Sequence, residues 1–545
     1  MTYAADFETT GKLNLQTDGR VRVWLWSLVN CETKEEYYGT ELTEFVDLIL
    51  QLKCDKIYFH NLRFDGSFLL YWMVENNWLY GIDYTCMIDE MNIWYEIKII
   101  SGETSIKIWD SLKKFPGQSV QSISKMYKIE GKKEKPYFEM YRPPDYKPTT
   151  EEIEYCLQDS RIIAYAIYNE EKIGHKAITL SSDAFNGVKK FIGGYKGWRK
   201  NFPSINLEDD NFIRRSYKGG WVYVNPKYKN KELHNTVSYD VNSLYPWVMH
   251  DCLLPYGKPL HRKPFAGEQY VTKFECEFEL KDGFLPTVQI KNNMHYKQTE
   301  YLTESSGRVE LHMTNIDYEL FCKHYDILYE GEHEYITFTS KVGLLAPYID
   351  YWTEQKIKCK HEGDDAGYYI AKRWLNSPYG KTGMRPDRIN KIPSTITDKL
   401  DFECQDSLGE PIYVPYATFV CAQARYKTIT AAQANYDNFI YADTDSIHLT
   451  EETDVIDVDD YKLGYWKLEG HYPVAKYIRP KTYIHALEDY TVTDIKCAGM
   501  PDTIKNICKY EDFRIGAKWD TGKLQQTRVK GGCLLVDRGY SITDT

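Results

Sequence analysis

The stretch Phe439-Ile-Tyr-Ala-Asp443-Thr-Asp445-Ser-Ile-His-Leu449 places two aspartates between two short apolar runs. This pattern predicts two short strands that meet at a tight turn. Side chains two positions apart on an extended segment point to the same face, so we expect Asp443 and Asp445 to face one small volume. Two carboxylates held that close repel each other unless a cation lies between them or one is protonated. The stretch therefore predicts a divalent-metal site on a β-hairpin.

Three simpler interpretations compete with this metal site. An aspartate-rich turn is often only a turn, because Asp hydrogen-bonds its own backbone there. A calcium loop of the helix-loop-helix type needs an oxygen ligand and a glycine where this chain has Ile447 and His448, so that class is excluded. A phosphatase of the Asp-x-Asp-x-Thr type would place the acidic pair near the start of its domain, but only about a hundred residues follow the pair here and Ile447 does not fit its motif, so that class is not favoured. A third carboxylate elsewhere in the chain would decide for the metal site.

Composition describes an ordinary soluble globular protein that is long enough for about three domains. Its 545 residues are 43% hydrophobic and 27% charged. The net charge of −11 argues against a histone-like binder but permits a nucleic-acid enzyme, whose acidic clusters offset basic surface. The 13 cysteines are scattered and include no Cys-x-x-Cys pair, so no zinc site or disulfide framework is indicated. The chain starts with a strand-like run and contains no apolar run of membrane length, which predicts an intracellular, reduced protein.

The order of the predicted elements indicates at least two modules. Residues 1–110 alternate strand-like and helical runs, as in an α/β domain. A helix is predicted from the capping sequence at Thr149 to about Lys172, with a domain boundary near 175–185. Residues 217–300 are rich in predicted strands. The segment 349–376 is predicted as helix with an interruption at Gly363 or Gly367.

Four acids near the amino terminus lie on three predicted elements. Asp6 and Glu8 alternate on one strand and share a face, and Asp65 follows another apolar strand. Tyr155 and Asp159 lie one turn apart on the predicted helix. Four such acids could hold two divalent ions about 4 Å apart, which would clamp the attacking water and the leaving oxygen of a phosphodiester, with Tyr155 orienting the water. Taken singly, each acid is more readily a solvated edge residue or the partner of an arginine.

The third carboxylate for the hairpin is Asp240, at the end of a predicted strand in Tyr239-Asp-Val-Asn-Ser-Leu-Tyr245. Asp240 with Asp443 and Asp445 would complete a site for two Mg²⁺ ions, with the Val241 carbonyl as an additional oxygen ligand. One ion would lower the pKa of an attacking 3′-hydroxyl, and the other would bind a triphosphate. We expect Tyr245 to lie under the incoming sugar, where its ring would exclude a 2′-hydroxyl.

A cationic helix between these acids completes the predicted nucleotide site. Lys372 and Asn376 lie one helical turn apart, and Tyr379 is seven residues from Lys372, so the three are expected on one face. Lys360 would join that face if the helix is continuous. A lysine can neutralise phosphate charge, and an aromatic ring can cover the nascent base pair. A lysine on a helix is ordinarily only solvated.

These motifs resemble those of a known family. The amino-terminal spacings resemble the proofreading 3′–5′ exonuclease of family-B DNA polymerases: Asp6-x-Glu8, Asn61-x-x-x-Asp65 and Tyr155-x-x-x-Asp159. The motifs Asp-Val-Asn-Ser-Leu-Tyr-Pro, Leu-Asn-Ser-x-Tyr-Gly-Lys and Tyr-x-Asp-Thr-Asp-Ser resemble the three polymerase motifs of that family. The closer resemblance is to the protein-primed polymerases of small tailed bacteriophages, the phi-twenty-nine type. The matches run in order from Asp6 to Tyr483.

The resemblance implies further site residues. Lys133 matches the catalytic lysine of the nuclease, although Lys132 and Lys135 leave the register open. Tyr217-Lys-Gly-Gly220 is similar to a template clamp between domains, and Lys481-Thr-Tyr483 resembles a primer-terminus contact. The DNA-binding residues implied by the resemblance are Asn61, Phe64, Phe68, Ser111, Leu112, Tyr217, Gly219, Gly220, Arg425, Lys481 and Tyr483.

The fold implied by the resemblance is α/β and α+β multidomain, with an RNase H-like exonuclease domain followed by a right-hand polymerase domain with two insertions. The first insertion is expected to grip a priming protein, and the second to encircle DNA and separate its strands. The expected bounds are exonuclease 1–178 and polymerase 179–545, the latter comprising palm 179–290 and 412–470, first insertion 291–346, fingers 347–382, second insertion 383–411 and thumb 471–545.

The implied function is a DNA-directed DNA polymerase that replicates a linear phage-type genome with 3′–5′ proofreading, protein priming and strand displacement. The cofactor would be Mg²⁺, with Mn²⁺ as a substitute, two ions at each site. The implied partners are primer-template and single-stranded DNA, deoxynucleoside triphosphates and a terminal protein, the enzyme acting as a monomer or as a heterodimer with that protein in the cytoplasm of a bacterial host. The alternatives are a family-B polymerase that needs no primer protein, a nuclease with an inactive polymerase half, and a non-catalytic DNA-binding protein.

This chain departs from the family pattern at three places. Pro378 stands two residues after Asn376 and prevents a regular helix from continuing, so Tyr379 is expected to be aimed differently. Cys421 replaces a threonine four residues before Arg425, which weakens one expected DNA contact. The second insertion is short, which weakens the expectation of strand displacement.

Overall fold

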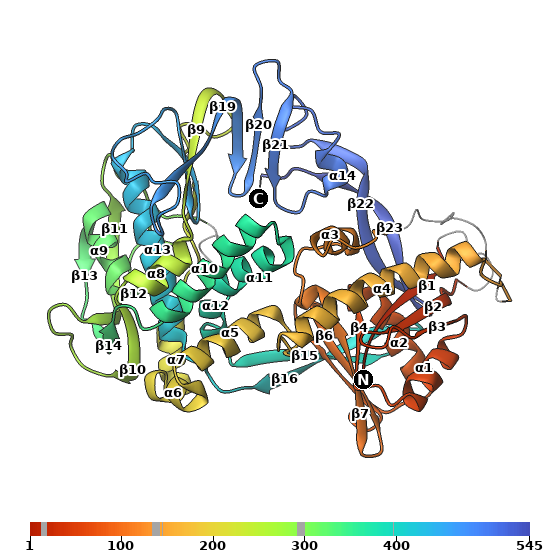
Figure 1. Ribbon diagram of the computed structural model, residues 1–545. Coiled ribbons are helices and arrows are strands. Elements are labelled where there is room, and N and C mark those ends of the chain that lie inside the picture. Colours follow the sequence, from red (N-terminus) through yellow and green to blue (C-terminus); the bar gives the residue numbers. More distant parts are fainter. Residues whose placement is uncertain (12–18, 133–141, 144, 291–299, 396, 545) are drawn as a thin grey trace.

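The computed structural model describes residues 1–11, 19–132, 142–143, 145–290, 300–395 and 397–544 (Figure 1). Lys133 and residues 291–299 of the expected first insertion lie outside the described residues. Among the described residues, no helix combines the length and apolar character needed to cross a membrane.

The amino-terminal module is a seven-stranded sheet of order β3-β2-β1-β4-β7-β6-β5. Its central strands β1, β4 and β7 are parallel, and the outer strands are antiparallel. The fully buried strand β2 reads as a continuous apolar run, as expected for a strand covered on both faces. The strands are β1 Thr2–Thr9, β2 Val23–Asn30, β3 Glu36–Gly39, β4 Lys56–Phe59, β5 Tyr84–Ile88, β6 Trp94–Ser101 and β7 Thr104–Asp110.

The helices α1 to α4 accompany this sheet (Figure 1). Helix α4 (Thr150–Lys172) packs on β1 and β2. Its capping box is complete, because the Thr149 side chain accepts from the backbone of Glu152 and the Glu152 side chain accepts from that of Thr149. The predicted start and end of this helix are confirmed. The other elements are α1 Leu42–Gln51, α2 Leu62–Glu75, the 3₁₀ turn Ser111–Lys113 and α3 Val120–Met126.

A second seven-stranded sheet, of order β21-β20-β19-β9-β18-β17-β8, carries the predicted hairpin. The hairpin is confirmed as β17 (Phe439–Asp443) and β18 (Ser446–Leu449), and β18 pairs with β9 (Glu232–Val241). The buried helix α13 (Val414–Ala434) packs against β17 and β18. The remaining strands are β8 Val222–Val224, β19 Trp466–Arg479, β20 Thr482–Ala486 and β21 Val492–Cys497.

In the sequence, α5 (Leu180–Phe191), α6 (Gly194–Asn201) and α7 (Leu207–Arg214) follow the amino-terminal module, and α8 (Leu244–Asp251) follows β9. A five-stranded sheet follows, in which β11 pairs with β12, β13 and β14, and β14 pairs with β10. Its elements are β10 Leu254–Leu260, β11 Gln269–Leu280, β12 Val309–Thr314, α9 Asn315–His324, β13 Tyr325–Glu330 and β14 Glu334–Lys341.

Two of the expected boundaries cut through sheets. A boundary at 290 separates β11 from its hydrogen-bonded neighbour β12, so the sheet favours a first insertion that begins near β10. A boundary at 471 divides β19, which pairs with β9 from Trp466 to Lys476 and with β20 from Val474 to Arg479. Sequence patterns identified these strands but not their partners, because pairing over long separations leaves no local signal.

The helical segment 349–376 is interrupted as predicted. Helix α10 (Ala346–Glu362) ends at Gly363, whose φ of 64° is the left-handed conformation that glycine adopts readily. Asp364 then caps α11 (Asp365–Asn376) by accepting from the Gly367 backbone. Helices α10 and α11 pack on each other as a hairpin.

Two long hairpins reach the amino-terminal sheet (Figure 1). The hairpin of β15 (Asp387–Ser394) and β16 (Asp401–Leu408) packs beside the edge strand β5. The hairpin of β22 (Lys518–Val529) and β23 (Gly532–Ser541) packs on α2 and follows the short helix α14 (Asp502–Lys505). The two hairpins meet where Arg528 donates to the Leu400 carbonyl at 2.9 Å.

Candidate active sites

Asp240 and Asp445 come together where β9 meets the β17–β18 turn. Asp240 lies opposite Ser446 in the strand register. The next residue, Val241, donates its backbone N–H to the Asp445 carbonyl at 2.8 Å. The third predicted acid, Asp240, therefore lies beside the hairpin, and the simple-turn interpretation is not favoured.

The pKa of Asp240 is raised to about 8, first by burial and then by the negative charge of Asp445. The positive charges of Lys372 and Lys467 oppose this increase. Burial also raises the pKa of Asp445. A divalent cation would relieve both the desolvation and the repulsion of these carboxylates, so their chemistry fits a metal.

Asp443 is arranged differently from the prediction. The chain turns at Thr444, whose φ is 63°, so Asp443 and Asp445 do not lie on one extended segment. Asp443 instead binds Lys481, whose Nζ lies 2.7 and 2.8 Å from its two carboxylate oxygens. The assumption of a two-residue repeat failed because a tight hairpin turn has no extended residue at its centre.

Tyr245 and Tyr379, which were expected to contact the sugar and the base pair, lie against each other. Their rings stack with centroids 4.4 Å apart and an interplanar angle of 26°. Pro378 does not misplace Tyr379, because it opens a new short helix, α12 (Pro378–Thr382), at a position where proline is tolerated. Cys421 is buried near both rings and raises the pKa of each phenol after the larger effect of burial, so in this structure it does not offer a DNA contact.

The lysines of the helical hairpin differ from the prediction. Lys372 lies near enough to Asp240 and Asp445 to lower the pKa of both. Lys360 does not extend the same helix, because α10 ends before α11 begins, and its side chain is exposed. Asn376 is also exposed, and its amide donates to the Lys372 carbonyl at 3.0 Å.

Lys356 is a cation that sequence reasoning missed. It lies one turn before Lys360 on α10, and its Nζ donates to Ser243 Oγ at 3.1 Å, beside the Asp240 strand. Burial and the charges of Lys372 and Lys360 lower its pKa. Helical spacing indicated the correct face of α10, but the depth of each lysine depends on packing between helices.

Arg425 has a structural position rather than the expected DNA contact. Its side chain is 4% exposed and forms an ion pair with Asp317 at 2.7 Å. Its guanidinium also donates to the carbonyls of Lys218 and Gly219 at 2.6 and 2.9 Å. Arg425 thus holds the Tyr217-Lys-Gly-Gly220 loop from beneath.

The two glycines of that loop have different surroundings. A Cβ on Gly220 would lie 2.5 Å from Thr444 Oγ1, whereas a Cβ on Gly219 would meet no atom within 4 Å. The loop is also tied to the β17–β18 turn, because the Thr444 N–H donates to the Trp221 carbonyl at 2.8 Å. The close contact between the loop and the turn therefore requires glycine at position 220. At position 219 there is room for a side chain.

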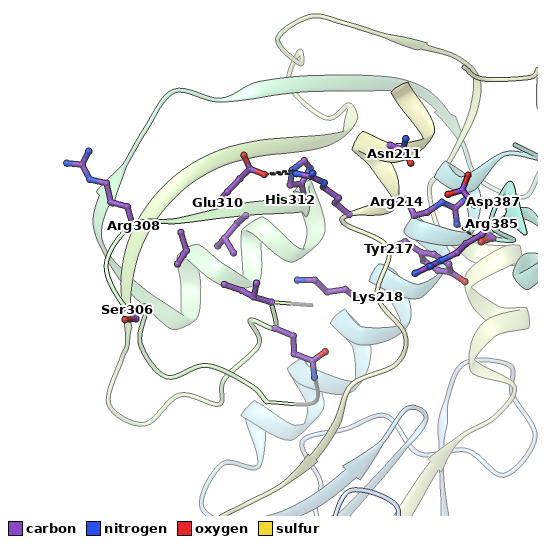
Figure 2. Close-up of a pocket in the computed structure, with 16 residues that line it drawn as sticks. Asn211, Arg214, Tyr217, Lys218, Ser306, Arg308, Glu310, His312, Arg385 and Asp387 are labelled. Atoms are coloured by element: carbon purple, nitrogen blue, oxygen red, sulfur yellow. Dashed lines mark hydrogen bonds and ion pairs between the residues drawn. The ribbon is translucent and has the colours of Figure 1, made fainter. Parts of the chain in front are cut away.

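Tyr217 and Lys218 line a cavity of about 1100 Å³ with the segments around β12 and β15 (Figure 2). Arginines from all three regions surround it, but Glu310 accepts from Arg215 at 2.7 Å. Figure 2 also shows Glu310 hydrogen-bonded to His312, at 3.2 Å. No sequence pattern indicates this cluster of cations, since its members come from three separate segments: Arg214 and Arg215, Arg308, and Arg385.

Tyr483 lies next to the Lys481 contact. It is half-buried, with its ring 5.2 Å from that of Tyr441 and from that of His448. The Tyr441 hydroxyl accepts the backbone N–H of Lys481 at 3.0 Å. This aromatic cluster positions the Lys481 turn against the hairpin.

The four amino-terminal acids also come together. Asp6 and Glu8 lie on β1 with Cys156 of α4 beside them, and ligand atoms of the three all lie within 4.8 Å of one another. No other group of three such side chains meets that limit among the described residues, so Asp240, Asp443 and Asp445 do not meet it. Burial, followed by the charges of Asp159, Asp65 and Glu8, raises the pKa of Asp6 well above its usual value.

A lysine completes this acidic site. Lys132 Nζ lies 2.5 Å from Asp159 Oδ2 and 5.3 Å from the centre of the Tyr155 ring. Tyr155 is buried beside these acids, and burial raises the pKa of its phenol. Lys133, the expected catalytic lysine, is outside the described residues. The lysine that contacts Asp159 among the described residues is Lys132.

Some residues expected to contact DNA here are buried instead. Phe68 is 1% exposed, and Ser111 is fully buried, with its Oγ 2.9 Å from His60 Nδ1. Phe64 and Leu112 are half-buried and remain accessible. Asn61 has a φ of 76° at the start of α2, and its backbone N–H donates to Asp110 at 3.0 Å.

Known proteins resemble the chain over its whole length. The family described as DNA polymerase type B, organellar and viral, matches residues 135–462. The DNA polymerase of Bacillus phage phi29 is 40% identical, with 99% of this chain and 98% of the phage protein covered.

Solved structures agree with this result. The phi29 DNA polymerase complexed with primer-template DNA and incoming nucleotide superimposes with a TM-score of 0.91 and 37% identity, over 99% of this chain and 100% of that one. The phi29 enzyme complexed with single-stranded DNA gives 0.89 and 36%, with the same coverage. The fold is therefore the expected mixed α/β multidomain architecture, and the chain belongs to family B of the DNA polymerases and, within it, to the phi29-type phage enzymes.

Proposed function

We propose that this polymerase extends a DNA 3′-hydroxyl at Asp240, Asp443 and Asp445 and removes nucleotides at Asp6, Glu8, Asp65 and Asp159. The observation that carries the proposal is the presence of two separate groups of buried or half-buried carboxylates, each with a lysine nearby. Bringing carboxylates together raises their pKa values and costs electrostatic energy. Such clusters are found in functional sites far more often than in structural cores.

At the polymerase site, Asp240, Asp445, the Val241 carbonyl and a released Asp443 would hold two Mg²⁺ ions, with Mn²⁺ as a substitute. Bound there, the ions would supply charge neutralisation and a hydroxyl of lowered pKa. Lys372 and Lys356 supply positive charge for a triphosphate. The stacked Tyr245 and Tyr379 exclude water and form a flat wall against the sugar and base.

At the nuclease site, Asp6, Glu8, Asp65 and Asp159 are the proposed ligands of two further Mg²⁺ ions. Tyr155 would orient the attacking water through its hydroxyl. Lys132, with its ammonium against Asp159, places a positive charge where a scissile phosphate would lie. Asn61, Phe64 and Leu112 are the accessible members of the expected single-strand contact.

The two hairpins support the proposed encirclement of DNA. The β15–β16 hairpin contacts both the amino-terminal sheet and, through Leu400, the β22–β23 hairpin. Trp94 and Phe402 pack edge to face at 5.8 Å, and Arg528 lies 5.2 Å over the Phe402 ring. A ring of protein closed around the DNA by these two hairpins would give processivity and strand displacement.

Domain bounds and partners follow as proposals. The chain comprises a nuclease domain to about residue 178 and a polymerase domain beyond it, with a first insertion that begins near β10. Template contacts would come from Tyr217 and Gly219, with Lys481 and Tyr483 at the primer terminus. Primer-template DNA and deoxynucleoside triphosphates are the proposed substrates, and a terminal protein is the proposed primer within the bacterial host.

Primer extension by an Asp443→Ala/Asp445→Ala variant tests the polymerase site. We expect a loss of more than about a thousandfold, since these carboxylates act together at one centre. Extension at the wild-type rate would refute the site. A separate assay tests priming: deoxyadenylate incorporation on a short linear template, with and without a candidate terminal protein. Equal incorporation without that protein would point to a member that needs no primer protein.

A further inference from the structure

Helix α11 contacts the amino-terminal module as well as the polymerase site. Lys372 on this helix faces the palm carboxylates. The adjacent face meets residues 111–119, the segment between β7 and α3, which we call the strand loop. The Tyr369 hydroxyl donates to the Pro116 carbonyl at 3.0 Å, and Arg373 Nη2 donates to the same oxygen at 3.2 Å. Two side chains of the polymerase module thus hold one carbonyl of the nuclease module.

Apolar packing surrounds these hydrogen bonds. Ala366 is 8% exposed, and Tyr369 packs beside it in a cluster with Phe115 and Ile123 of the amino-terminal module. Arg373 lies 5.4 Å over the Tyr369 ring, so the two donors support each other. The contact is therefore packed around Tyr369, while the Arg373 side chain lies at its exposed edge.

The strand loop in turn positions the start of α2. His60 contacts the loop at both ends, through Ser111 Oγ at 2.9 Å and the Gln118 carbonyl at 3.0 Å. Asp110, which leads into the loop, accepts from the backbones of Asn61 and Leu112, both at 3.0 Å. His60 and Asn61 immediately precede α2, the helix that carries Asp65. A shift of the strand loop would therefore move an acid of the nuclease site.

A second anchor holds the other side of the loop. Lys114 is 2% exposed and binds Asp183 of α5 at 2.5 Å and the His175 carbonyl at 3.0 Å. This ion pair ties one end of the loop to the boundary between the modules. Pro116 lies two residues further on, where α11 supplies the side-chain donors.

We propose that Tyr369 and Arg373 are positioning residues for the degradation of single-stranded DNA, although both lie on a helix of the polymerase module. By holding the Pro116 carbonyl, they fix the strand loop and, through His60, the start of α2. The inference rests on the proposed nuclease function of the amino-terminal acids. It makes α11 a structural element shared by synthesis and degradation.

Degradation of an end-labelled single-stranded oligonucleotide by the full chain tests this role. Tyr369→Phe and Arg373→Met are each expected to lower kcat/KM about threefold, and the double variant about tenfold, as for the loss of one and of two ordinary hydrogen bonds. Tyr368→Phe is the matched control, since it removes the same atom from the next residue, whose hydroxyl has no hydrogen-bond partner among the described residues. It is expected to degrade DNA at the wild-type rate.

Two further measurements separate positioning from a general loss of structure. Arg373→Lys keeps a donor and is expected to recover most of the activity, and extension of a matched primer should stay within about twofold of wild type in every variant. Wild-type degradation by the double variant, an equal loss in Tyr368→Phe, or a parallel loss of primer extension would each overturn the inference. Asp6→Ala distinguishes the underlying proposal: if it still degrades DNA, the nuclease assignment itself fails.

Discussion

Asp240 and Asp443 show how single side chains set the state of the polymerase site. Burial and the charge of Asp445 raise the pKa of Asp240 to about 8, and the charges of Lys372 and Lys467 oppose this increase. Asp443 is held by Lys481 and is not free to join the other acids. Binding of a cation by all three acids therefore requires the Asp443 carboxylate to exchange its ammonium partner for the metal.

Arg425→Met tests a buried ion pair at the same scale. The change leaves Asp317 and the carbonyls of Lys218 and Gly219 without their donor, and the loss of one partner of a buried pair costs about 3–5 kcal/mol. We expect a lower denaturant midpoint, measured by circular dichroism, together with weaker template binding. Arg262→Met, in an exposed pair with Glu268, is the control and should leave the midpoint unchanged. A midpoint for Arg425→Met equal to that of the control would contradict the buried role.

His485 gives a pH dependence whose sign follows from its burial. Burial lowers its pKa to about 4, whereas an unfolded histidine has a pKa of about 6.5. The unfolded chain binds more protons between these values, so this stability is complete above pH 6.5 and is lost as the pH falls toward 4, by about 3 kcal/mol at most.

His485→Asn should therefore flatten the acid side of a plot of thermal midpoint against pH. His471→Asn, at an exposed position, is the control and should leave the plot unchanged. A steeper acid slope in His485→Asn would show that the imidazole is not held neutral.

At the scale of elements, local signals predicted what local chemistry determines. The acidic hairpin, the strand of Asp240, the capped helix α4 and the break at Gly363 all follow from turn, cap and periodicity rules, and all are confirmed. The partners of Arg425, Lys481 and Lys356 could not be predicted in this way. Each depends on an element that is distant in the sequence, and the local sequence around a charged residue does not show how deeply its side chain is buried.

Gly220→Ala tests the contact between the loop and the catalytic turn. The added Cβ would meet Thr444 at 2.5 Å and push the turn that carries Asp443 and Asp445 out of place. We expect primer extension to fall more than about tenfold while single-strand degradation is kept, because a displacement of about 1 Å at a catalytic centre costs about a hundredfold.

Gly219→Ala is the matched comparison, since open space surrounds its Cβ. It should lose much less extension than Gly220→Ala. Equal losses in the two variants would show that flexibility of the loop, rather than its contact with Thr444, is what matters.

At the scale of the whole molecule, the sequence predicted the order of the modules better than the boundaries and contacts between them. Both active sites could be assembled from spaced motifs, but boundaries at 290 and 471 divide sheets whose strands pair across long separations. The contact of the β22–β23 hairpin with α2 and the β15–β16 hairpin had no sequence signal either, because it joins segments far apart in the chain, whose buried side chains include Phe68, Leu400 and Leu534.

Loosening the junction of the two hairpins should shorten the DNA made in each binding event. Arg528→Met together with Phe402→Ser removes a hydrogen bond, a cation–π contact and an aromatic contact. We expect product length in the presence of a DNA trap to fall several-fold, about what 1–2 kcal/mol would produce. Degradation of a short oligonucleotide serves as the control and should be unchanged. Full-length products with the trap present would show that the junction does not close the path.

The central claim is that two carboxylate sites in one chain carry out two reactions independently. The direct test measures matched-primer extension and single-strand degradation side by side in Asp240→Asn and Asp6→Asn, two substitutions that keep side-chain shape. The account predicts a crossed pattern: Asp240→Asn loses extension and keeps degradation, and Asp6→Asn loses degradation and keeps extension. Loss of both activities in either variant, or of neither, would contradict it.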